Sequence, residues 1–308
     1  MNKARALRWF TLICFLPLYG VVSAQPNFTS EQGARTKLVI LGTGTPVPSS
    51  ERYGPAVAIV VDDKAYVFDA GSGMVRRLHQ ARGMGMEQLD PLNIQQLFIS
   101  HLHSDHILDY SEFVFDYWWH REKPIHTFGP PGLQALNDAA ENMFAADIER
   151  RQFDGNGNFP DGYKVNVTEI TEDGVVFEDD KISVTAFAVD HGSWEYAYGY
   201  RVETPDKVIV ISGDTNFSQN LMTYSEGVDF LVHEIYSSAA IAEARRDGIN
   251  TLHTSPENVA LIANTVNPEV LVLYHLVFFN LPAESILEEL ARHYDGKVLM
   301  PDDLTVIE

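Results

Sequence analysis

The sequence predicts an α/β fold in which two β-sheets pack face to face and helices cover the outside. Three observations support this prediction. Short runs of β-branched and aliphatic residues recur from residue 37 onward, as is typical of buried strands. Helical patterns lie between pairs of these runs, and the order of strand then helix recurs in the second half. With 308 residues, 45% of them hydrophobic, the chain can bury a large core as one domain or as two closely packed halves.

The N-terminal segment differs from the rest and predicts a secretory signal peptide over residues 1–24. Three basic residues precede an apolar run of 14 residues, which ends at Val22-Ser23-Ala24. Because the run contains Pro17 and Gly20, and because a membrane span needs about 20 apolar residues, we expect cleavage rather than anchoring. Residues 25–36 are then a polar linker and residues 37–308 the folded domain. The mature protein is expected in the periplasm or outside the cell, without a membrane partner.

Cysteine content and charge exclude several classes of function. The single cysteine, Cys14, lies in the expected signal peptide, so the mature chain has no disulfide or thiolate chemistry. The formal charge is −21, and it becomes −24 when the three basic residues of the leader are removed. Since nucleic-acid binding depends on neutralising phosphates with Lys and Arg, a surface this acidic predicts no nucleic-acid partner.

The expected elements follow one another from the linker to the end of the chain. The first apolar run stops at Gly42-Thr43-Gly44-Thr45-Pro46, which reads as a turn. Ser255-Pro256-Glu257 resembles a helix start, with Pro at the first helical position. The segment 154–158 reads as a surface loop. Expected strands are 37–41, 56–61, 65–68, 96–100, 182–188, 198–202, 208–211, 230–233 and 270–275, and expected helices are 131–145, 255–264 and 283–293.

The strongest functional signal is the segment His101-Leu102-His103-Ser104-Asp105-His106, directly after the apolar strand at 97–100. A loop that leaves a strand holds its first residues rigidly, so alternate histidines can face one ion while Asp105 and His106 face a second. Three imidazoles and a carboxylate within six positions have little explanation as a solvated loop. The segment therefore predicts a site for two metal ions.

Further candidate ligands stand at the ends of later strands. His191 follows the strand at 182–188, Asp214 follows 208–211, and His275 ends the strand at 270–275. A lone His or Asp at a strand end is more often a cap or a hydrogen-bonded side chain than a ligand. Their shared position at one edge of the sheets favours a common metal site.

These motifs together resemble a known family. The ordered set LGTGTP, FDAGSG, FISHLHSDHILDY, VDHG, ISGDT, HE, LHTS and LYH spans residues 41–275 and is similar to the ribonuclease Z branch of the metallo-β-lactamase superfamily. Within that branch the chain resembles bacterial arylsulfatases of the same fold, through SHLHSDHILDY and the segments 121–125 and 129–132.

The resemblance implies an αββα sandwich of two mixed sheets, with two metal ions along one edge. His101, His103 and His191 would bind the first ion, Asp105, His106 and His275 the second, and Asp214 would bridge the two. A water between the ions would supply the bridging hydroxide that attacks the substrate. Zinc suits this set, although His and Asp ligands also accept manganese or iron.

Three further residues receive roles from the same resemblance. His253 would stand over the leaving group as a general acid or charge stabiliser, and Glu234 would fix its tautomer. The alternative for His253 is a polar residue at a helix N-terminus. With the ligand Asp105, these are the expected catalytic residues. Asp69 is expected beneath the segment 101–106, which we call the metal loop, and in contact with a ligand histidine. The aromatic residues at 113–119 and 194–200 are either core or substrate wall.

The predicted activity is hydrolysis of a small anionic ester, either an aryl sulfate or a phosphodiester. The alternatives are a ribonuclease Z-like nuclease, a lactone or carboxyl ester hydrolase, and a non-catalytic metal-binding protein of the same fold. The basic arm with which ribonuclease Z holds transfer RNA lies between the positions matching His191 and Asp214, and here they are only 23 residues apart. The short gap favours a small ester. The sequence leaves open a homodimer as a partner.

Overall fold

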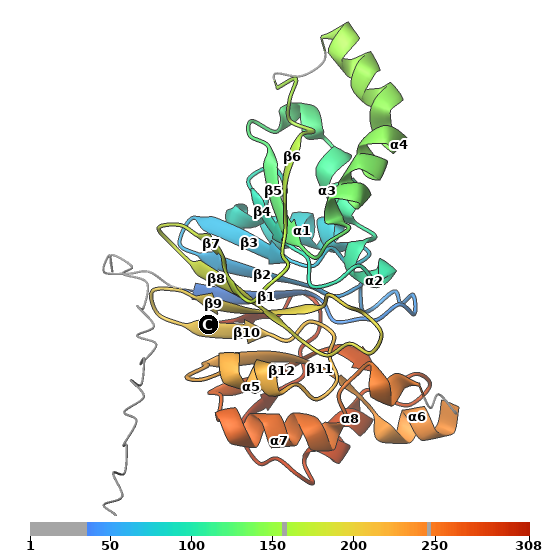
Figure 1. The fold of residues 1–308 in the computed structure, drawn as a ribbon, viewed down its shortest axis with the longest axis vertical. Helices are drawn as coiled ribbons and strands as arrows, with labels where there is room; N and C mark the ends of the chain where they lie inside the picture. Colours follow the sequence, from blue (N-terminus) through green and yellow to red (C-terminus); the bar gives the residue numbers. More distant parts are fainter. Residues whose placement is uncertain (1–35, 156–158, 245–247) are drawn as a thin grey trace, which may run out of the picture.

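Two seven-stranded β-sheets form the centre of the protein, and helices cover their outer faces (Figure 1). The computed structural model describes residues 36–155, 159–244 and 248–308. The layered α/β architecture predicted from the sequence is confirmed. The expected signal peptide, the linker up to residue 35 and residues 156–158 of the expected surface loop lie outside the described residues.

The first sheet has the strand order β14-β1-β2-β3-β4-β5-β6. Its strands from β14 to β3 pair antiparallel, and those from β3 to β6 pair parallel. The sheet is therefore mixed, as predicted. Its strands are β1 (Thr36–Gly42), β2 (Ala56–Val61), β3 (Lys64–Phe68), β4 (Gln96–Phe98), β5 (Ile125–Gly129), β6 (Val165–Glu169) and β14 (Val306–Ile307).

The second sheet has the strand order β13-β12-β11-β10-β9-β8-β7. Here β7 to β10 pair antiparallel, and β10 to β13 pair parallel. Each sheet thus has an antiparallel part and a parallel part. The strands are β7 (Gly174–Glu178), β8 (Ser183–Ala188), β9 (Tyr198–Glu203), β10 (Val208–Ile211), β11 (Phe230–Tyr236), β12 (Val270–Val277) and β13 (Val298–Leu299).

Helices lie on the outer face of each sheet (Figure 1). On the first sheet these are α1 (Met74–Gly83), α2 (Ser104–Ile107), α3 (Tyr110–Phe115) and α4 (Leu133–Asp154). On the second they are α5 (Gln219–Tyr224), α6 (Ser238–Ala244), α7 (Pro256–Val266) and α8 (Glu284–Leu290). Among the described residues, no helix has the length and apolar character needed to cross a bilayer.

The start of α7 is the one that the sequence predicts. The hydroxyl of Ser255 accepts a hydrogen bond of 3.2 Å from the backbone N–H of Asn258, and Pro256 occupies the first turn. The hydroxyl satisfies one of the N–H groups that a helix leaves free at its start. Because His253 lies two residues before this cap, the cap also fixes the chain that carries it.

Aromatic rings fill part of the space between the two sheets. Phe98 stacks on both Phe68 and Phe128, with 4.9 Å between ring centroids in each pair. Tyr200, from the second sheet, meets Phe98 edge-on at 5.8 Å. Such ring pairs prefer offset-stacked or edge-to-face geometry. This core fixes the end of β3, which Asp69 follows, and the end of β4, which leads into the metal loop.

Candidate dinuclear metal site

The metal loop is held in place by Asp69, the residue after β3. Asp69 has a positive φ of 60°, a conformation that Asp tolerates better than most residues. Its carboxylate accepts hydrogen bonds from the backbone N–H of Ser100 at 2.7 Å and from the Ser100 hydroxyl at 2.9 Å. The same carboxylate lies 2.8 Å from Nδ1 of His106. The expected contact between Asp69 and a loop histidine is therefore present.

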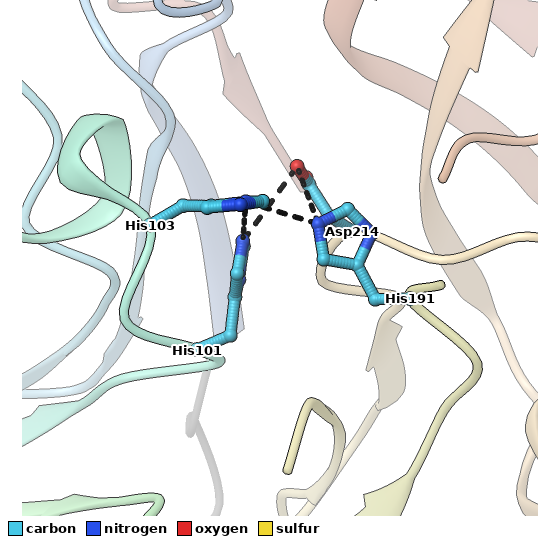
Figure 2. A group of neighbouring side chains, drawn as sticks. All are labelled: His101, His103, His191 and Asp214. Carbon is cyan, nitrogen blue, oxygen red and sulfur yellow. Dashed lines mark hydrogen bonds and ion pairs between the residues drawn. The ribbon is translucent and has the colours of Figure 1, made fainter. Parts of the chain in front are cut away.

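Three histidines converge on one point at the edge of the sheets (Figure 2). Nδ1 of His103 lies 2.9 Å from Nε2 of His101 and 3.0 Å from Nε2 of His191. Asp214 closes the group, since its Oδ2 lies 3.9 Å from His101 and 4.0 Å from His191. One ligand atom from each of these four residues lies within 4.8 Å of all the others, so a single ion can contact all four.

A second group adjoins the first and shares Asp214 with it. Nε2 of His275 lies 3.2 Å from Oδ2 of Asp105 and 3.3 Å from Oδ2 of Asp214. Nε2 of His106 lies 3.3 Å from the other oxygen, Oδ1, of Asp214. Oδ2 of Asp214 thus lies near histidines of both groups, and Oδ1 faces the second group alone. A carboxylate placed between two ligand groups in this way can bridge two cations.

The unsatisfied polar atoms of these residues fit divalent cations. Among the described residues, the buried atoms Nε2 of His106 and Oδ1 of Asp214 have no hydrogen-bond partner. Such atoms are costly in an apolar interior unless they are paired or bind a metal. Nδ1 of His191 faces the carbonyl oxygen of Leu252 at 2.8 Å. An acceptor there places the ring proton on Nδ1, so the lone pair of Nε2 faces the site.

Burial and neighbouring charges set the protonation of the cluster. Burial lowers the pKa of His101, His103 and His191 below the usual value for histidine, which favours the neutral ring that binds metals. Burial opposes ionisation of Asp214, but His275 and His106 outweigh it and hold the pKa of this carboxyl well below its usual range. The three histidines of the first group are therefore neutral beside an ionised Asp214. Burial lowers the pKa of His106, but Asp214 and Asp69 outweigh it and hold that pKa well above its usual value.

His253 and Glu234 form a separate pair beside the second group. Nδ1 of His253 lies 3.2 Å from Oε2 of Glu234, and the other oxygen of Glu234 accepts a 2.7 Å hydrogen bond from the backbone N–H of Thr254. Burial lowers the pKa of His253, but Glu234 and Asp214 outweigh this effect and raise the pKa to about 9. Glu234 is fully buried, so its carboxylate is fixed and orients the imidazole.

The structure decides between core and substrate wall for most of the aromatic residues. Phe113, Phe115 and Trp118 belong to the core under α4, and Tyr198 and Tyr200 belong to the core between the sheets. Tyr117 is 49% exposed on the outer side of the first sheet. Of the tryptophans in the described part of the chain, Trp194 reaches the site, and its indole N–H donates to Nε2 of His103 at 2.6 Å.

All of the predicted site residues meet at this edge. The structure brings together the seven expected ligands and the pair His253 and Glu234, across both sheets. Sequence reasoning missed two supporting residues. Ser100 links Asp69 to His101, whose Nδ1 lies 3.0 Å from its hydroxyl. Asp109 accepts hydrogen bonds from the backbone of Gly73 and Val75, which ties the start of α1 to the metal loop.

Comparison with known proteins agrees with this geometry. A family model described as "Beta-lactamase superfamily domain" matches residues 64–276. The chain belongs to the metallo-β-lactamase superfamily. The ribonuclease Z of Mycolicibacterium paratuberculosis is 30% identical over 282 residues, which cover 87% of this chain and 96% of that protein. The relationship places the chain on the ribonuclease Z-like side of the superfamily, as predicted, and supports a metal-dependent hydrolase.

Solved structures show the same fold. The metallo-β-lactamase fold protein YhfI from Bacillus subtilis has a TM-score of 0.67 at 19% identity, covering 89% of this chain and all of that chain. The short form of human tRNase Z has a TM-score of 0.65 at 22% identity, covering 88% of this chain and 98% of that chain. The expected αββα sandwich of the superfamily is therefore confirmed.

These relatives correct one prediction made from the sequence. We expected no nucleic-acid partner, because the chain is acidic and because few residues separate His191 from Asp214. That prediction is wrong, since the relative that matches along nearly its whole length is a ribonuclease and the human protein of the same fold is a tRNase. Net charge averages over the whole surface, whereas metal ions and a few local side chains decide what binds at the site. The predicted resemblance to arylsulfatases finds no support in the proteins named above.

Proposed function

We propose that this protein is a dinuclear metal-dependent phosphodiester hydrolase. The observation that carries the proposal is the pair of ligand groups that meet at Asp214, whose carboxylate lies near His101 and His191 of one group and near His106 and His275 of the other. In this assignment one ion is held by His101, His103 and His191 and the other by Asp105, His106 and His275. Zinc suits the donor set, and manganese or iron would also be accepted.

Two divalent cations held by these residues would supply a more acidic water as the nucleophile and positive charge for the anionic oxygens of the ester. The residues of the chain supply orientation and proton transfer. Asp105 and Asp214 bring two buried negative charges, which offset the repulsion between two cations. Ser100 and Asp69 fix the imidazoles of His101 and His106 from behind, as ligand histidines require.

His253 is the proposed general acid. It lies beside the second ligand group, with its ring stacked on that of His275 at 5.2 Å between centroids. Its Nδ1 faces Glu234, which holds the ring orientation and stabilises the protonated form. A proton donated from His253 to the leaving oxygen would neutralise the charge that develops there. Asp105, His253 and Glu234 remain the proposed catalytic residues.

Phosphodiesters are favoured over sulfate esters because the relatives found by comparison are ribonucleases, which cleave phosphodiester bonds. Both ester classes present anionic oxygens to a pair of cations, so the ligands themselves do not separate them. A sulfate ester remains the second candidate, on the sequence resemblance alone. We also propose that the protein is exported, on the pattern of residues 1–24. Mass spectrometry of periplasmic protein would test this, and an intact Met1 in the cytoplasm would contradict it.

The test of the proposed function combines metal analysis with a panel of substrates. The purified protein is stripped of metal, reloaded with zinc or manganese, and assayed on bis-nitrophenyl phosphate, nitrophenyl sulfate and a precursor transfer RNA. We expect about two ions per chain and cleavage of the phosphodiester. His103→Ala and Asp214→Ala should lose metal and activity together, while His293→Ala, a change at an exposed histidine, should lose neither. Full activity with one ion or none would refute the dinuclear site, and cleavage of the sulfate alone would refute the phosphodiester.

A further inference from the structure

A cleft opens directly beside the metal ligand Asp105. It has a volume of about 150 Å³, and Asp105 lines it together with Leu108 and the segment from Thr45 to Ser49. This segment belongs to the loop between β1 and β2. The cleft therefore lies where the organic part of an ester would project when its phosphate contacts the second ligand group.

Two further grooves continue this cleft in different directions. The groove on one side, about 270 Å³, shares Thr45 and Val47 with the cleft and runs along Phe278 and Phe279. The groove on the other side, about 290 Å³, shares Leu108 with the cleft and runs along α4 to Met143. The cleft thus continues into one groove on each side, and we call these two grooves the arms of the site. A phosphodiester has two organic substituents, one for each arm, whereas a monoester has only one.

Apolar side chains gather along these arms although they are open to solvent. Val47 and Leu108 are each 60% exposed, and Met143 is 66% exposed. Exposed apolar side chains that form a continuous patch mark binding surfaces more often than isolated ones do. Their position next to a metal ligand connects the patch to the proposed chemistry.

The charges along the arms fit an uncharged substituent. Arg52 is the only cation that lines the cleft and the two grooves within the described part of the chain. Its guanidinium already donates to the Thr43 hydroxyl at 2.7 Å, the Pro301 carbonyl at 3.1 Å and the Asp302 carboxylate at 3.1 Å. The ligand Asp105 is the only anion there. An apolar substituent would therefore bury surface against Val47 and Leu108, and because it carries no charge, its burial would not have the desolvation cost of an ion.

We propose that the two arms select phosphodiesters that carry an apolar aryl group or an alkyl group larger than methyl, with Leu108 and Val47 as specificity-determining residues. The inference rests on the proposed function and adds the substrate class to it. Because Leu108 belongs to both the cleft and the α4 groove, it lies at the junction of the two. Val47 has the same position between the cleft and the other groove.

The test compares two diesters that have the same nitrophenyl leaving group. The second substituent is phenyl in one and methyl in the other, and the readout is the ratio of their kcat/KM values in the metal-loaded full chain. We expect a ratio of about 10 for the wild type, which corresponds to about 1.4 kcal/mol. In Leu108→Ser and Val47→Ser the ratio should fall toward about 2, a loss of the order expected for part of one apolar contact. Leu261→Ser is the matched control, because Leu261 is 51% exposed and lies on α7.

The possible outcomes separate this inference from the proposed function. If the metal-loaded protein cleaves neither diester, the proposed function is wrong. If it cleaves both with a ratio near 1, or if the ratio is the same in Leu108→Ser, Val47→Ser and Leu261→Ser, the apolar arms are refuted while the proposed function stands. A thymidine substituent that is preferred over phenyl equally in wild type and Leu108→Ser would also overturn the inference. Melting temperature and metal content confirm that each variant is folded and loaded.

Discussion

Asp69→Asn should weaken the second metal site without unfolding the protein. Asn tolerates the positive φ of 60° at this position about as well as Asp does, so the substitution should leave the backbone conformation unchanged. The amide oxygen can still accept from the N–H of Ser100. The amide NH2 then replaces the oxygen that lies 2.8 Å from Nδ1 of His106. Two donors face each other there unless His106 moves its proton to Nε2.

The size of the expected loss in metal affinity depends on which nitrogen of His106 receives the proton. Nε2 of His106 faces Asp214 at 3.3 Å and is the atom assigned to the metal. A proton there must be displaced before an ion binds, so affinity at this site should fall about 10- to 100-fold, the usual loss when the partner of a ligand histidine is removed. This corresponds to about 1.4 to 2.8 kcal/mol. The first site should change less, because His101, His103 and His191 make no hydrogen bond to Asp69 in the structure.

The assay is a zinc titration in competition with a chromophoric chelator, fitted to two sites. Asp63→Asn is the control, because the Asp63 side chain is 83% exposed and lies away from the metal loop. A weaker second site in Asp69→Asn alone would support the proposed tautomer of His106. Equal affinities for both ions in the two variants would refute the reasoning, and with it the role of Asp69 as the partner of a ligand.

Three further predictions follow from the site. His253→Ala should keep both ions but react about 10² to 10⁴ times more slowly, and wild-type turnover would make His253 only a residue before the α7 cap. Chelation should lower Tm by about 5 to 10 °C in a thermal melt, because loss of an ion at 100 times its Kd costs about 2.7 kcal/mol; an unchanged Tm would count against tight binding. Zinc at Nδ1 of His103 requires a proton on Nε2, where Trp194 now donates, so metal titration should shift tryptophan fluorescence, and Trp194→Phe should abolish the shift.

Much of the fold could be predicted because strands buried on both faces leave a strong sequence signal. β2 and β10 have the predicted limits, and both are aliphatic along their whole length. β6 and β7 were missed because they lie at sheet edges and are half exposed, so their apolar pattern is interrupted. The helix α1 was missed because it follows Gly73, at φ 87°, without a side-chain cap. α4 continues past the predicted end at residue 145 to Gly155, the first residue that favours a left-handed C-terminal cap.

The site could be predicted further than the fold because its ligands stand at strand ends. The spacing of His101, His103, Asp105 and His106 indicates two ions without knowledge of the tertiary structure. Assigning His191, Asp214 and His275 to particular ions needed the family resemblance, because contacts between the two sheets leave no local signal. The contact of Trp194 with His103 also depends on tertiary structure, since the two residues are far apart in the sequence.

One strand of the second half, β14, lies in the first sheet, and this arrangement makes the chain suited to fragment complementation. The chain passes from the first sheet to the second at an exposed turn around Glu172, and β14 later returns to pair with β1. A chain divided at this turn would leave four metal ligands on one piece and three on the other. Neither piece has a complete ligand group, and the second carries a strand that only the first can accept. We therefore expect the pieces to reassemble only together, with metal uptake as the signal of their association.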